Sequence, residues 1–267
     1  MRGRGNRSLP LLDRVAIVTG ASSGIGRVTA LMLAELGARV ALAGRRESAL
    51  DEVAEEIRRL GREALAVRTD VTDRDQVDHL VAATLARWEA VDILVANAGA
   101  YIRSPIRELS VEDVRRSMAV NFYGALYAVL AVQPHMLERG DGHIVLVSSL
   151  DGKKGLPCDA PYVAAKFALA GYGEVLRQEL RGSGVDVTIV FPGRVDTPLI
   201  DTLEVPRLSA KIPADAVARA ITRAIRRPRP EVILPFQARA FHLVNVLSPR
   251  LGDWLVRLLH LQGWETT

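Results

Sequence analysis

The sequence has very little cysteine: Cys158 is the single example among 267 residues. One cysteine can form no disulfide within the chain and can supply no cysteine-based metal cluster. A chain without disulfides is typical of a reducing compartment, so we expect a cytoplasmic protein. The five histidines show no paired ligand spacing, and we therefore expect no metal site.

Lysine and long apolar runs are also scarce. Four of the 35 basic residues are lysines, and the arginines are scattered rather than clustered, which argues against a nucleic-acid partner. No apolar run reaches the length of a transmembrane helix. The segment Met1–Pro10 is basic, rich in glycine and without the apolar stretch of a signal peptide, so we expect a flexible tail.

What the sequence does contain is 49% hydrophobic residues, arranged as short apolar runs that alternate with longer amphipathic segments. Short runs of β-forming residues that end in glycine are typical of buried parallel strands. The segments between them have helical spacing and glycine stops. The expected strands are 14–20, 39–44, 63–71, 91–99, 142–149, 185–193 and 231–235, and the expected helices are 26–38, 47–61, 74–88, 111–138, 161–181 and 213–227.

This alternation predicts an α/β fold, a Rossmann-like doubly wound parallel sheet of about seven strands with helices on both faces. Because we find no linker and no internal repeat, we expect one catalytic domain over residues 11–235. Residues 236–267 are expected to form a C-terminal helical extension with two amphipathic stripes. The stripes comprise Phe236, Ala240, Leu243, Val244 and Leu247, then Leu251, Trp254, Leu255, Leu258 and Leu259.

The glycine-rich stretch TGASSGIG (19–26) lies between the first expected strand and the first expected helix. In that position Gly20 permits a tight turn, Gly24 lets the backbone approach a pyrophosphate, and Gly26 lets the helix pack on the sheet. The helix N-terminus then offers free N–H groups and a positive dipole end to phosphates. A plain tight turn is the alternative. The dinucleotide interpretation assigns cofactor contacts to Gly20, Ser22, Ser23, Gly24, Ile25 and Gly26.

Preference between NAD and NADP is set at the end of the second strand, where an acidic residue binds the ribose 2′-hydroxyl of NAD. Gly44 stands at that place, and Arg45 and Arg46 follow it directly. A guanidinium pairs with a 2′-phosphate, whereas a carboxylate would repel it. We therefore expect NADP(H) to be preferred, with NAD(H) as the alternative if both arginines are solvated loop charges.

Tyr162 and Lys166 are one helical turn apart in the otherwise small and apolar stretch APYVAAKFALAGY (160–172), so they lie on one helix face. A phenol with a pKa of about 10 is a poor acid or base at neutral pH. A nearby ammonium group stabilises the phenolate and lowers that pKa, which tunes the phenol for proton exchange with a substrate oxygen. A surface tyrosine–lysine pair is the alternative.

Several motifs in one order decide between these alternatives. After TGASSGIG the chain carries NAG (97–99), Asn121 in VNFYGA, VSS ending at Ser149, YVAAK, and PGRVDTP (192–198). In this order and spacing they resemble the short-chain dehydrogenase/reductase family in its single-domain branch, over roughly residues 14–234. The resemblance implies an NADP(H)-dependent oxidoreductase that interconverts a hydroxyl and a carbonyl group.

The resemblance also implies a role for each matching residue. Tyr162 would be the general acid/base, and Lys166 would lower its pKa and hold the nicotinamide ribose. Ser149, with Ser148 as the neighbouring alternative, would hydrogen-bond the substrate oxygen. Asn121 would position a water for a proton relay through the lysine. Beside Tyr162 and Lys166, the implied cofactor contacts are Asp70, Val71, Asn97, Ala98, Gly99, Pro192, Gly193, Val195 and Thr197.

Substrate choice is expected to come from residues 150–161 and from residues 199–211, which have the pattern of a short lid. The lid's apolar residues suggest a lipophilic alcohol or ketone as substrate; they are Leu199, Ile200, Leu203 and Val205. The same resemblance implies a homodimer or homotetramer that pairs through helices 111–138 and 161–181.

The C-terminal stripes leave three alternatives open: packing against the core or a second subunit, a substrate lid, or a helix pair in a membrane interface. The residues that fit peripheral contact with an anionic membrane are Arg239, Arg250 and Arg257 with Trp254 and Trp264. For the whole chain, the alternatives to a reductase are a catalytically silent NADP(H)-binding regulatory protein, a membrane-associated scaffold, and a lyase or epimerase of the same fold.

Overall fold

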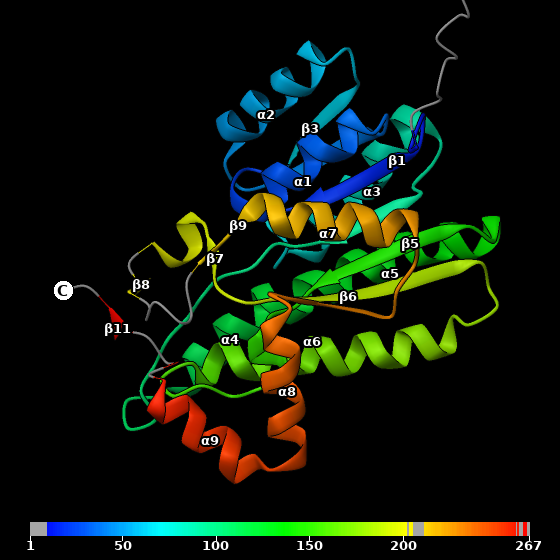
Figure 1. Cartoon of the computed structure of the whole chain (residues 1–267). Helices are drawn as coiled ribbons and strands as arrows, with labels where there is room; N and C mark the ends of the chain where they lie inside the picture. Colours follow the sequence, from blue (N-terminus) through cyan, green and yellow to red (C-terminus); the bar gives the residue numbers. More distant parts are fainter. Residues whose placement is uncertain (1–9, 202, 205–210, 260, 262–263, 266–267) are drawn as a thin grey trace, which may run out of the picture.

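The computed structural model describes residues 10–201, 203–204, 211–259, 261 and 264–265, so the expected tail lies outside the described residues apart from Pro10. Seven strands form the central sheet: β1 (Val15–Thr19), β2 (Arg39–Gly44), β3 (Ala64–Arg68), β4 (Ile93–Ala96), β5 (Gly142–Val147), β6 (Val185–Pro192) and β10 (Glu231–Leu234). Their order is β10-β6-β5-β4-β1-β2-β3, and every neighbouring pair is parallel (Figure 1). The expected fold class is confirmed.

The strands form where the sequence has uninterrupted apolar runs. β1 and β5 are buried at every position, because helices cover both faces of the sheet. Successive side chains of β1 enter two different cores: Val15 and Ile17 pack on one face, and Ala16 and Val18 pack on the other. A strand with one wet face would have alternated apolar with polar residues.

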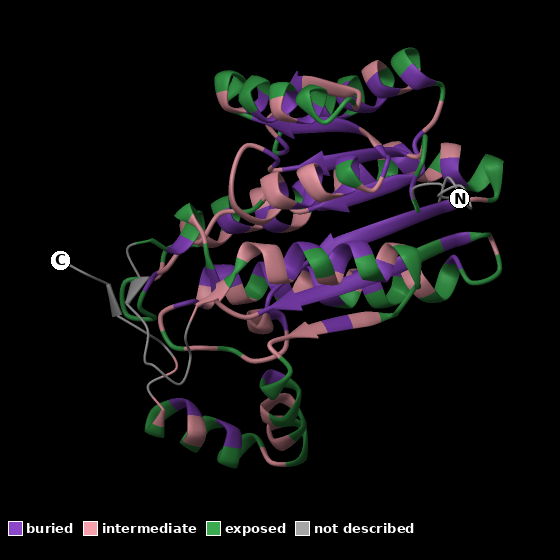
Figure 2. Ribbon diagram, turned by 45° about the horizontal axis from the view of Figure 1, so that its top comes forward, coloured by how far each residue is buried: buried purple, intermediate pink, exposed green. Residues whose placement is uncertain are grey.

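Two layers of helices enclose the sheet. One face is covered by α1 (Gly24–Glu35), α2 (Glu47–Arg59) and α7 (Ala214–Arg226), and the other by α3 (Arg74–Trp88), α5 (Gly124–Arg139) and α6 (Ala160–Glu179). Leu33 and Leu50 represent the first core, and Leu80 and Leu169 the second. Figure 2 shows the buried strands between these two layers.

The segment 111–138, expected as one helix, is three helical stretches in series. α4 (Val111–Met118) begins at a capping box on Ser110, a π-helical turn (Ala119–Tyr123) follows, and α5 continues from Gly124. The π turn contains the buried Asn121, which is 1% exposed. Because single π turns are frequent at functional sites, this break in the helix is a structural signal at a residue that the sequence also singles out.

The strand order reverses between β1 and β4, and open parallel sheets bind ligands at the carboxyl ends beside such a point. β1 ends at Thr19, directly before the glycine-rich loop, and β4 ends directly before Asn97. The Thr19 hydroxyl oxygen accepts from the backbone N–H groups of Asn97 and Ala98 at 3.0 Å each. These bonds bring the glycine-rich loop and the NAG motif together at the switch point.

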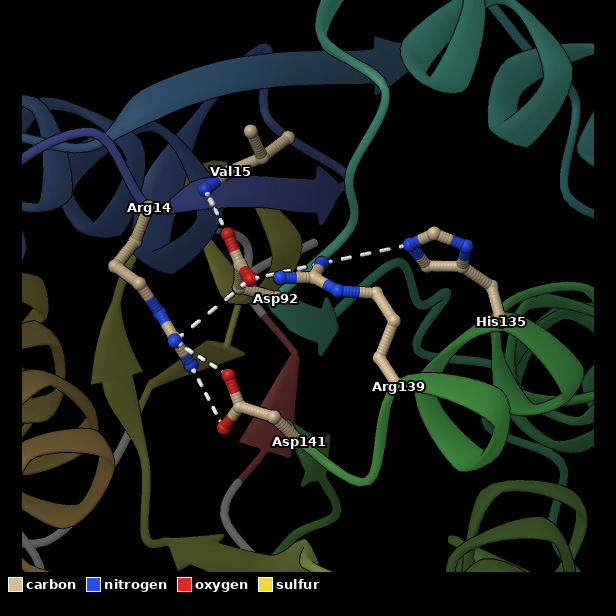
Figure 3. A network of polar contacts seen from close by, with 6 residues as sticks. All are labelled: Arg14, Val15, Asp92, His135, Arg139 and Asp141. Atoms are coloured by element: carbon tan, nitrogen blue, oxygen red, sulfur yellow. Dashed lines mark hydrogen bonds and ion pairs between the residues drawn. The ribbon is translucent and has the colours of Figure 1, made fainter.

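A charge network lies at the amino ends of the central strands, on the side of the sheet opposite the switch point (Figure 3). Asp92 is 3% exposed, and its Oδ2 accepts from the Val15 N–H at 2.7 Å. Its Oδ1 lies 3.1 Å from Arg139 and 3.7 Å from Arg14, and Arg14 also donates to Asp141 at 2.6 Å. The network joins the amino ends of β1, β4 and β5, where it stabilises the sheet away from the switch point.

Beyond β10 the chain forms a helical hairpin of α8 (Gln237–Leu247) and α9 (Pro249–Leu258). Two short strand pairs accompany it: β7 (Val195–Asp196) runs parallel to β9 (Ile212–Pro213), and β8 (Leu203–Glu204) runs antiparallel to β11 (Trp264–Glu265). The 3-10 turns are Leu150–Gly152 and Pro198–Ile200. None of the helices within the described ranges is long and apolar enough to span a bilayer.

Most of the predicted C-terminal stripe faces solvent. Leu243 is 58% exposed, Leu247 is 76% exposed and Trp254 is 51% exposed, and Figure 2 shows exposed positions along both hairpin helices. The hairpin buries other positions instead, namely Ala238 and Val256. Packing of the stripe against the core of the same chain is therefore contradicted, because the helices turn a different face inward.

Candidate active site

A cavity of about 740 Å³ lies at the carboxyl ends of β1, β4, β5 and β6. Every predicted site residue lines it except Gly26 and Asn121. The first half of the chain contributes Gly20, Ser22, Ser23, Gly24, Ile25, Arg45, Arg46, Asp70, Val71, Asn97, Ala98 and Gly99, and the second half contributes Ser149, Tyr162, Lys166, Pro192, Gly193, Val195 and Thr197. The fold thus gathers the two predicted groups around one space.

The glycine-rich loop is packed so closely that side chains would not fit. Gly20 has a φ of +67°, and a Cβ on it would lie 2.9 Å from the Ala98 Cα. A Cβ on Gly26 would lie 2.2 Å from the Gly20 carbonyl oxygen, so Gly26 supports the loop from beneath and does not line the cavity. α1 begins at Gly24 in the cavity wall, where its first N–H groups have no helical partners. Bare backbone and a helix N-terminus fit a dinucleotide phosphate.

Two cations lie beside this loop. Arg45 and Arg46 follow the last residue of β2, and both are exposed at the cavity wall. Arg46 donates to the carbonyl and hydroxyl oxygens of Ser22 at 3.3 Å each. The Asp70 carboxylate is engaged locally, since its Oδ1 accepts from the Thr72 hydroxyl at 2.8 Å. The positive charge of Arg46 is therefore held against the glycine-rich loop.

Tyr162 and Lys166 project from the first turns of α6 beside the end of β5. Lys166 Nζ lies 5.5 Å from the centre of the Tyr162 ring and donates to the Val147 carbonyl at 3.0 Å. The Ser149 hydroxyl lies close enough to the Tyr162 phenol to lower the pKa of that phenol. The alternative of a surface tyrosine–lysine pair is contradicted, because both residues are buried.

The two neighbouring serines have different surroundings. The Ser148 hydroxyl donates to the Lys166 carbonyl oxygen at 3.1 Å, which joins β5 to α6. The Ser149 hydroxyl instead lies beside Tyr162 and Asp151. Ser149 is therefore the serine whose hydroxyl is placed next to the phenol.

Asn121 lies behind the cavity wall. Its amide nitrogen donates to the carbonyl oxygens of Ala100 at 2.8 Å and Ser117 at 3.1 Å, and its Oδ1 accepts from the Ala100 N–H at 3.2 Å. A Cβ on Gly99 would lie 2.9 Å from that Oδ1 and 3.8 Å from Lys166 Nζ. Asn121 thus fixes the loop after β4 close to the lysine, and the water relay stays a prediction.

The electrostatics of the pair differ from the expectation. Burial raises the pKa of Tyr162 above its usual value, the negative charge of Asp151 raises it further, and the neighbouring Ser149 hydroxyl lowers it. Burial lowers the pKa of Lys166 to about 8, and Asp151 opposes that change. The prediction that Lys166 holds the phenol's pKa below its usual value is wrong for the chain by itself, because burial and the charges of Asp151 and Asp159 raise that pKa.

Four residues around the phenol were not predicted as part of the site, and three of them are charged: Tyr101, Arg103, Asp151 and Asp159. Tyr101 packs edge-on against Tyr162 with ring centres 5.0 Å apart. Asp159, fully buried, accepts from Arg103 Nε at 2.9 Å. Burial and the charge of Asp159 raise the pKa of Asp151, a residue of the cavity wall, to about 7. One feature of the sequence could have indicated Asp151. It is an acidic residue two positions after the predicted serine, just after the end of a buried strand.

The cavity beyond the phenol is largely apolar. The hairpin contributes to this wall, since Ala238, Phe241 and His242 of α8 all line it. Arg194 donates to the Leu261 carbonyl oxygen, and Lys154 pairs with Asp253 of α9 at 2.5 Å. The larger apolar residues of this lining include Leu150, Leu156, Leu199, Ile200, Phe241, Leu259 and Leu261. The C-terminal segments therefore form part of the cavity, as the lid alternative requires.

The expected lid is partly described. Leu199 and Ile200 line the cavity, and Val205 lies outside the described residues. The backbone of Leu203 pairs with that of Glu265, so the lid segment and the end of the chain form one small sheet. Within the part of the chain that the structure covers, no three metal-ligating side chains gather.

A parallel sheet with a glycine-rich loop at its switch point, and a buried tyrosine–lysine pair in the same cavity, fit a nicotinamide-dependent Rossmann enzyme. Residues 14–206 match the family model described as short chain dehydrogenase. The chain belongs to the short-chain dehydrogenase/reductase family, and it is an NAD(P)(H)-dependent oxidoreductase.

Three relatives illustrate the match. An uncharacterized oxidoreductase YxnA of Bacillus subtilis is 37% identical over 96% of this chain and 75% of its own length. A short chain dehydrogenase/reductase of Burkholderia phymatum, solved in complex with NAD, is 28% identical with a TM-score of 0.84, over 91% of this chain and 96% of that one. A variant of actinorhodin polyketide ketoreductase, solved with NADPH, is 31% identical with a TM-score of 0.78, over 83% of this chain and 95% of that one.

Proposed function

We propose that this chain is an NADP(H)-dependent oxidoreductase that interconverts a hydroxyl and a carbonyl group on a lipophilic substrate. The observation that carries the proposal is the meeting of Ser149, Tyr162 and Lys166 with the glycine-rich loop in one cavity. A nicotinamide cofactor supplies or accepts the hydride when it is bound. The chain's own residues bind the dinucleotide, orient the substrate and move a proton at the Tyr162 hydroxyl.

In the direction of reduction, Tyr162 donates its proton to the carbonyl oxygen of the substrate. The phenol is protonated at neutral pH and can donate, but its raised pKa makes it a weaker acid, so the transfer depends on groups that stabilise the phenolate. Ser149 hydrogen-bonds the same oxygen and stabilises its developing charge. Lys166 has a pKa of about 8, remains mostly cationic at neutral pH, and attracts the phenolate that forms as the proton leaves. In oxidation the same groups act in reverse.

The test is a screen of NADPH oxidation over ketones, steroids, retinoids and acyl thioesters with wild type, Tyr162→Phe and Tyr172→Phe. Tyr172 is a matched control, because it lies on the same helix but packs against Phe122 and does not line the cavity. We expect Tyr162→Phe to lose at least about a hundredfold in kcat and Tyr172→Phe to lose little. Full activity of Tyr162→Phe on a substrate found this way would refute the assignment.

The preference for NADP(H) rests on Arg45 and Arg46 at the end of β2. A 2′-phosphate beside the glycine-rich loop would meet two guanidinium groups there and no carboxylate at the place of Gly44. In a fluorescence titration we expect Arg45→Asp to weaken NADPH binding at least about tenfold and to leave NADH binding nearly unchanged. Arg59→Asp is the control, since Arg59 is an exposed arginine of α2 outside the cavity lining. An unchanged ratio of the two affinities in Arg45→Asp would exclude this role.

Two separate apolar surfaces support the proposed partners. The helices of one face expose Leu130, Phe167 and Val175, which suits the homodimer or homotetramer that pairs through α4, α5 and α6. The outer side of the hairpin exposes Leu247 and Trp254.

We assign the hairpin surface to an anionic lipid surface. Arg239, Arg250 and Arg257 are exposed on the hairpin, and the pairing of Lys154 with Asp253 neutralises its acidic residue. A second copy of the same basic surface would place like charges opposite each other, whereas anionic headgroups would neutralise them.

Two substitutions separate these surfaces. We expect Leu247→Glu to abolish flotation with phosphatidylserine-containing vesicles and to leave the mass by light scattering unchanged. We expect Leu130→Glu to reduce the mass and to leave flotation unchanged. Equal flotation of Leu247→Glu and wild type would exclude the lipid surface, and a changed mass in Leu247→Glu would make the hairpin a subunit contact.

A further inference from the structure

The hydroxyl of Ser149 is held from two sides by one residue. The Asp151 backbone N–H donates to Ser149 Oγ at 3.1 Å, and Ser149 Oγ donates to Asp151 Oδ2 at 3.1 Å. A serine hydroxyl has one proton, so a hydroxyl that donates to a carboxylate cannot donate to a substrate oxygen at the same time. In this arrangement the proton that the proposed reaction needs from Ser149 is directed at Asp151.

The surroundings make this carboxyl group sensitive to pH. Burial and the charge of Asp159 raise the pKa of Asp151 to about 7, and the hydrogen bond from Ser149 and the charges of Arg194 and Lys166 oppose that rise. The group is therefore largely neutral below about pH 7 and largely anionic above it. The titratable and charged side chains that act on it come from three segments, and they are Tyr101, Asp159, Tyr162, Lys166 and Arg194; Arg103 pairs with Asp159 beside them.

We infer that Asp151 is a positioning residue that controls the Ser149 hydroxyl: the ionised carboxylate competes with the substrate oxygen for the serine proton, and the neutral carboxyl releases it. The inference rests on the proposed function, because it concerns the substrate oxygen that Ser149 would bind. Asp151 acts through Ser149 and needs no contact with the substrate itself.

Two observations distinguish this role from a purely structural one. The backbone N–H of Asp151 anchors the serine oxygen whatever side chain residue 151 carries, so the carboxylate is not needed to hold Ser149 in place. The carboxylate also acts on the phenol, since its negative charge raises the pKa of Tyr162. Ionisation of Asp151 thus weakens proton donation to the substrate from both Ser149 and Tyr162.

The test compares wild type with Asp151→Asn, which keeps the size of the side chain and removes its charge. The control is Asp186→Asn, because Asp186 is exposed near the amino end of β6 and does not line the cavity. With a substrate from the screen, kcat/KM for reduction by the wild type and by the control should fall about tenfold as the pH rises through about 7. Asp151→Asn should show no such fall and should exceed the wild type about threefold to tenfold at about pH 8. A profile that matches the wild type, or slow turnover at every pH, would overturn the inference.

A double-mutant cycle identifies the route of the effect. In the Ser149→Ala background, Asp151→Asn should lose the part of its influence on kcat/KM that runs through the serine, because the hydroxyl for which the carboxylate and the substrate compete is absent. The part that the charge of Asp151 exerts directly on Tyr162 should remain. NADPH affinity should be the same in all four proteins, since none of the changes alters the glycine-rich loop. Equal effects of Asp151→Asn with and without Ser149 would show that the carboxylate does not act through the serine.

An infrared titration separates this inference from the proposed function. In Tyr162→Phe, a protonated-carboxyl band that disappears on Asp151→Asn should be lost with a midpoint near pH 7. If reductase activity is found but this band is lost near the usual pKa of a carboxyl group, the role of Asp151 fails and the proposed function stands. If the band behaves as expected but no hydroxyl or carbonyl substrate turns over, the proposed function fails, and the role of Asp151 in it fails too.

Discussion

Replacing Gly26 by alanine tests the packing of the glycine-rich loop. A Cβ at this position would lie 2.2 Å from the Gly20 carbonyl oxygen and 2.6 Å from Asn97 Nδ2. Non-bonded carbon atoms are comfortable at about 3.5–4.0 Å, so the loop must move by more than about 1 Å to admit the methyl group. Overpacking of this kind costs about 1–3 kcal/mol of the free energy of unfolding.

The same movement should impair the dinucleotide site. Because Gly20 is in the cavity wall, its displacement misplaces the backbone groups that would bind phosphate, and loss of one hydrogen bond to a charged group reduces NADPH affinity by about tenfold or more. Gly171→Ala is the matched control: nothing lies within 4 Å of its Cβ position, and an alanine in the middle of α6 should stabilise the protein by about 1 kcal/mol. Urea unfolding and fluorescence titration measure both quantities. Wild-type stability and affinity in Gly26→Ala would refute the claim that the loop is closed to a side chain.

Three further changes test other parts of the molecule. Asp92→Asn removes the buried carboxylate that pairs with the part-exposed Arg139, and urea titration should show a loss of about 1–3 kcal/mol; no loss would make the network dispensable. His143 has a pKa lowered to about 4 by burial, below its value of about 6.5 in an unfolded chain, so acid favours unfolding. The free energy of unfolding should fall by about 2–3 kcal/mol between about pH 6.5 and about pH 4, and His143→Gln should flatten that fall; parallel curves would contradict the assignment. Lys154→Gln breaks the pair with Asp253, and trypsin should then cleave the hairpin faster than in wild type; equal rates would show that the pair does not hold it.

The sheet could be predicted from the sequence because its strands are buried on both faces. Such strands need apolar residues at every position, and the run Val15–Thr19 satisfies that need without reference to any other part of the chain. The positions of the predicted site residues follow from the same rule. Once the strands are parallel, the segments that follow them must meet at one edge, so Gly20 and Asn97 had to come together.

The contact between Arg103 and Asp159 beside the phenol could not be predicted in this way. Arg103 and Asp159 are 56 positions apart, and their contact depends on how two loops fold over the end of the sheet. Periodicity also could not reveal the π turn around Asn121, because the extra residue shows only in the hydrogen-bond pattern. The pKa of Tyr162 was predicted in the wrong direction for a related reason, since burial is a property of the whole fold and a neighbouring lysine is a property of one helix.

The hairpin shows what an amphipathic pattern leaves undecided. Periodicity indicates that a helix has an apolar face, but it does not say which partner covers that face. In α8 the residues Ala238 and Phe241 line the cavity, while Leu243 and Leu247 on another side are exposed. A helix with apolar residues on two sides needs two apolar neighbours, and the chain itself supplies one. Each exposed leucine forgoes about 25 cal/mol per Å² of apolar surface left in water, so contact with a lipid surface or a second subunit would stabilise the same hairpin that forms the cavity wall.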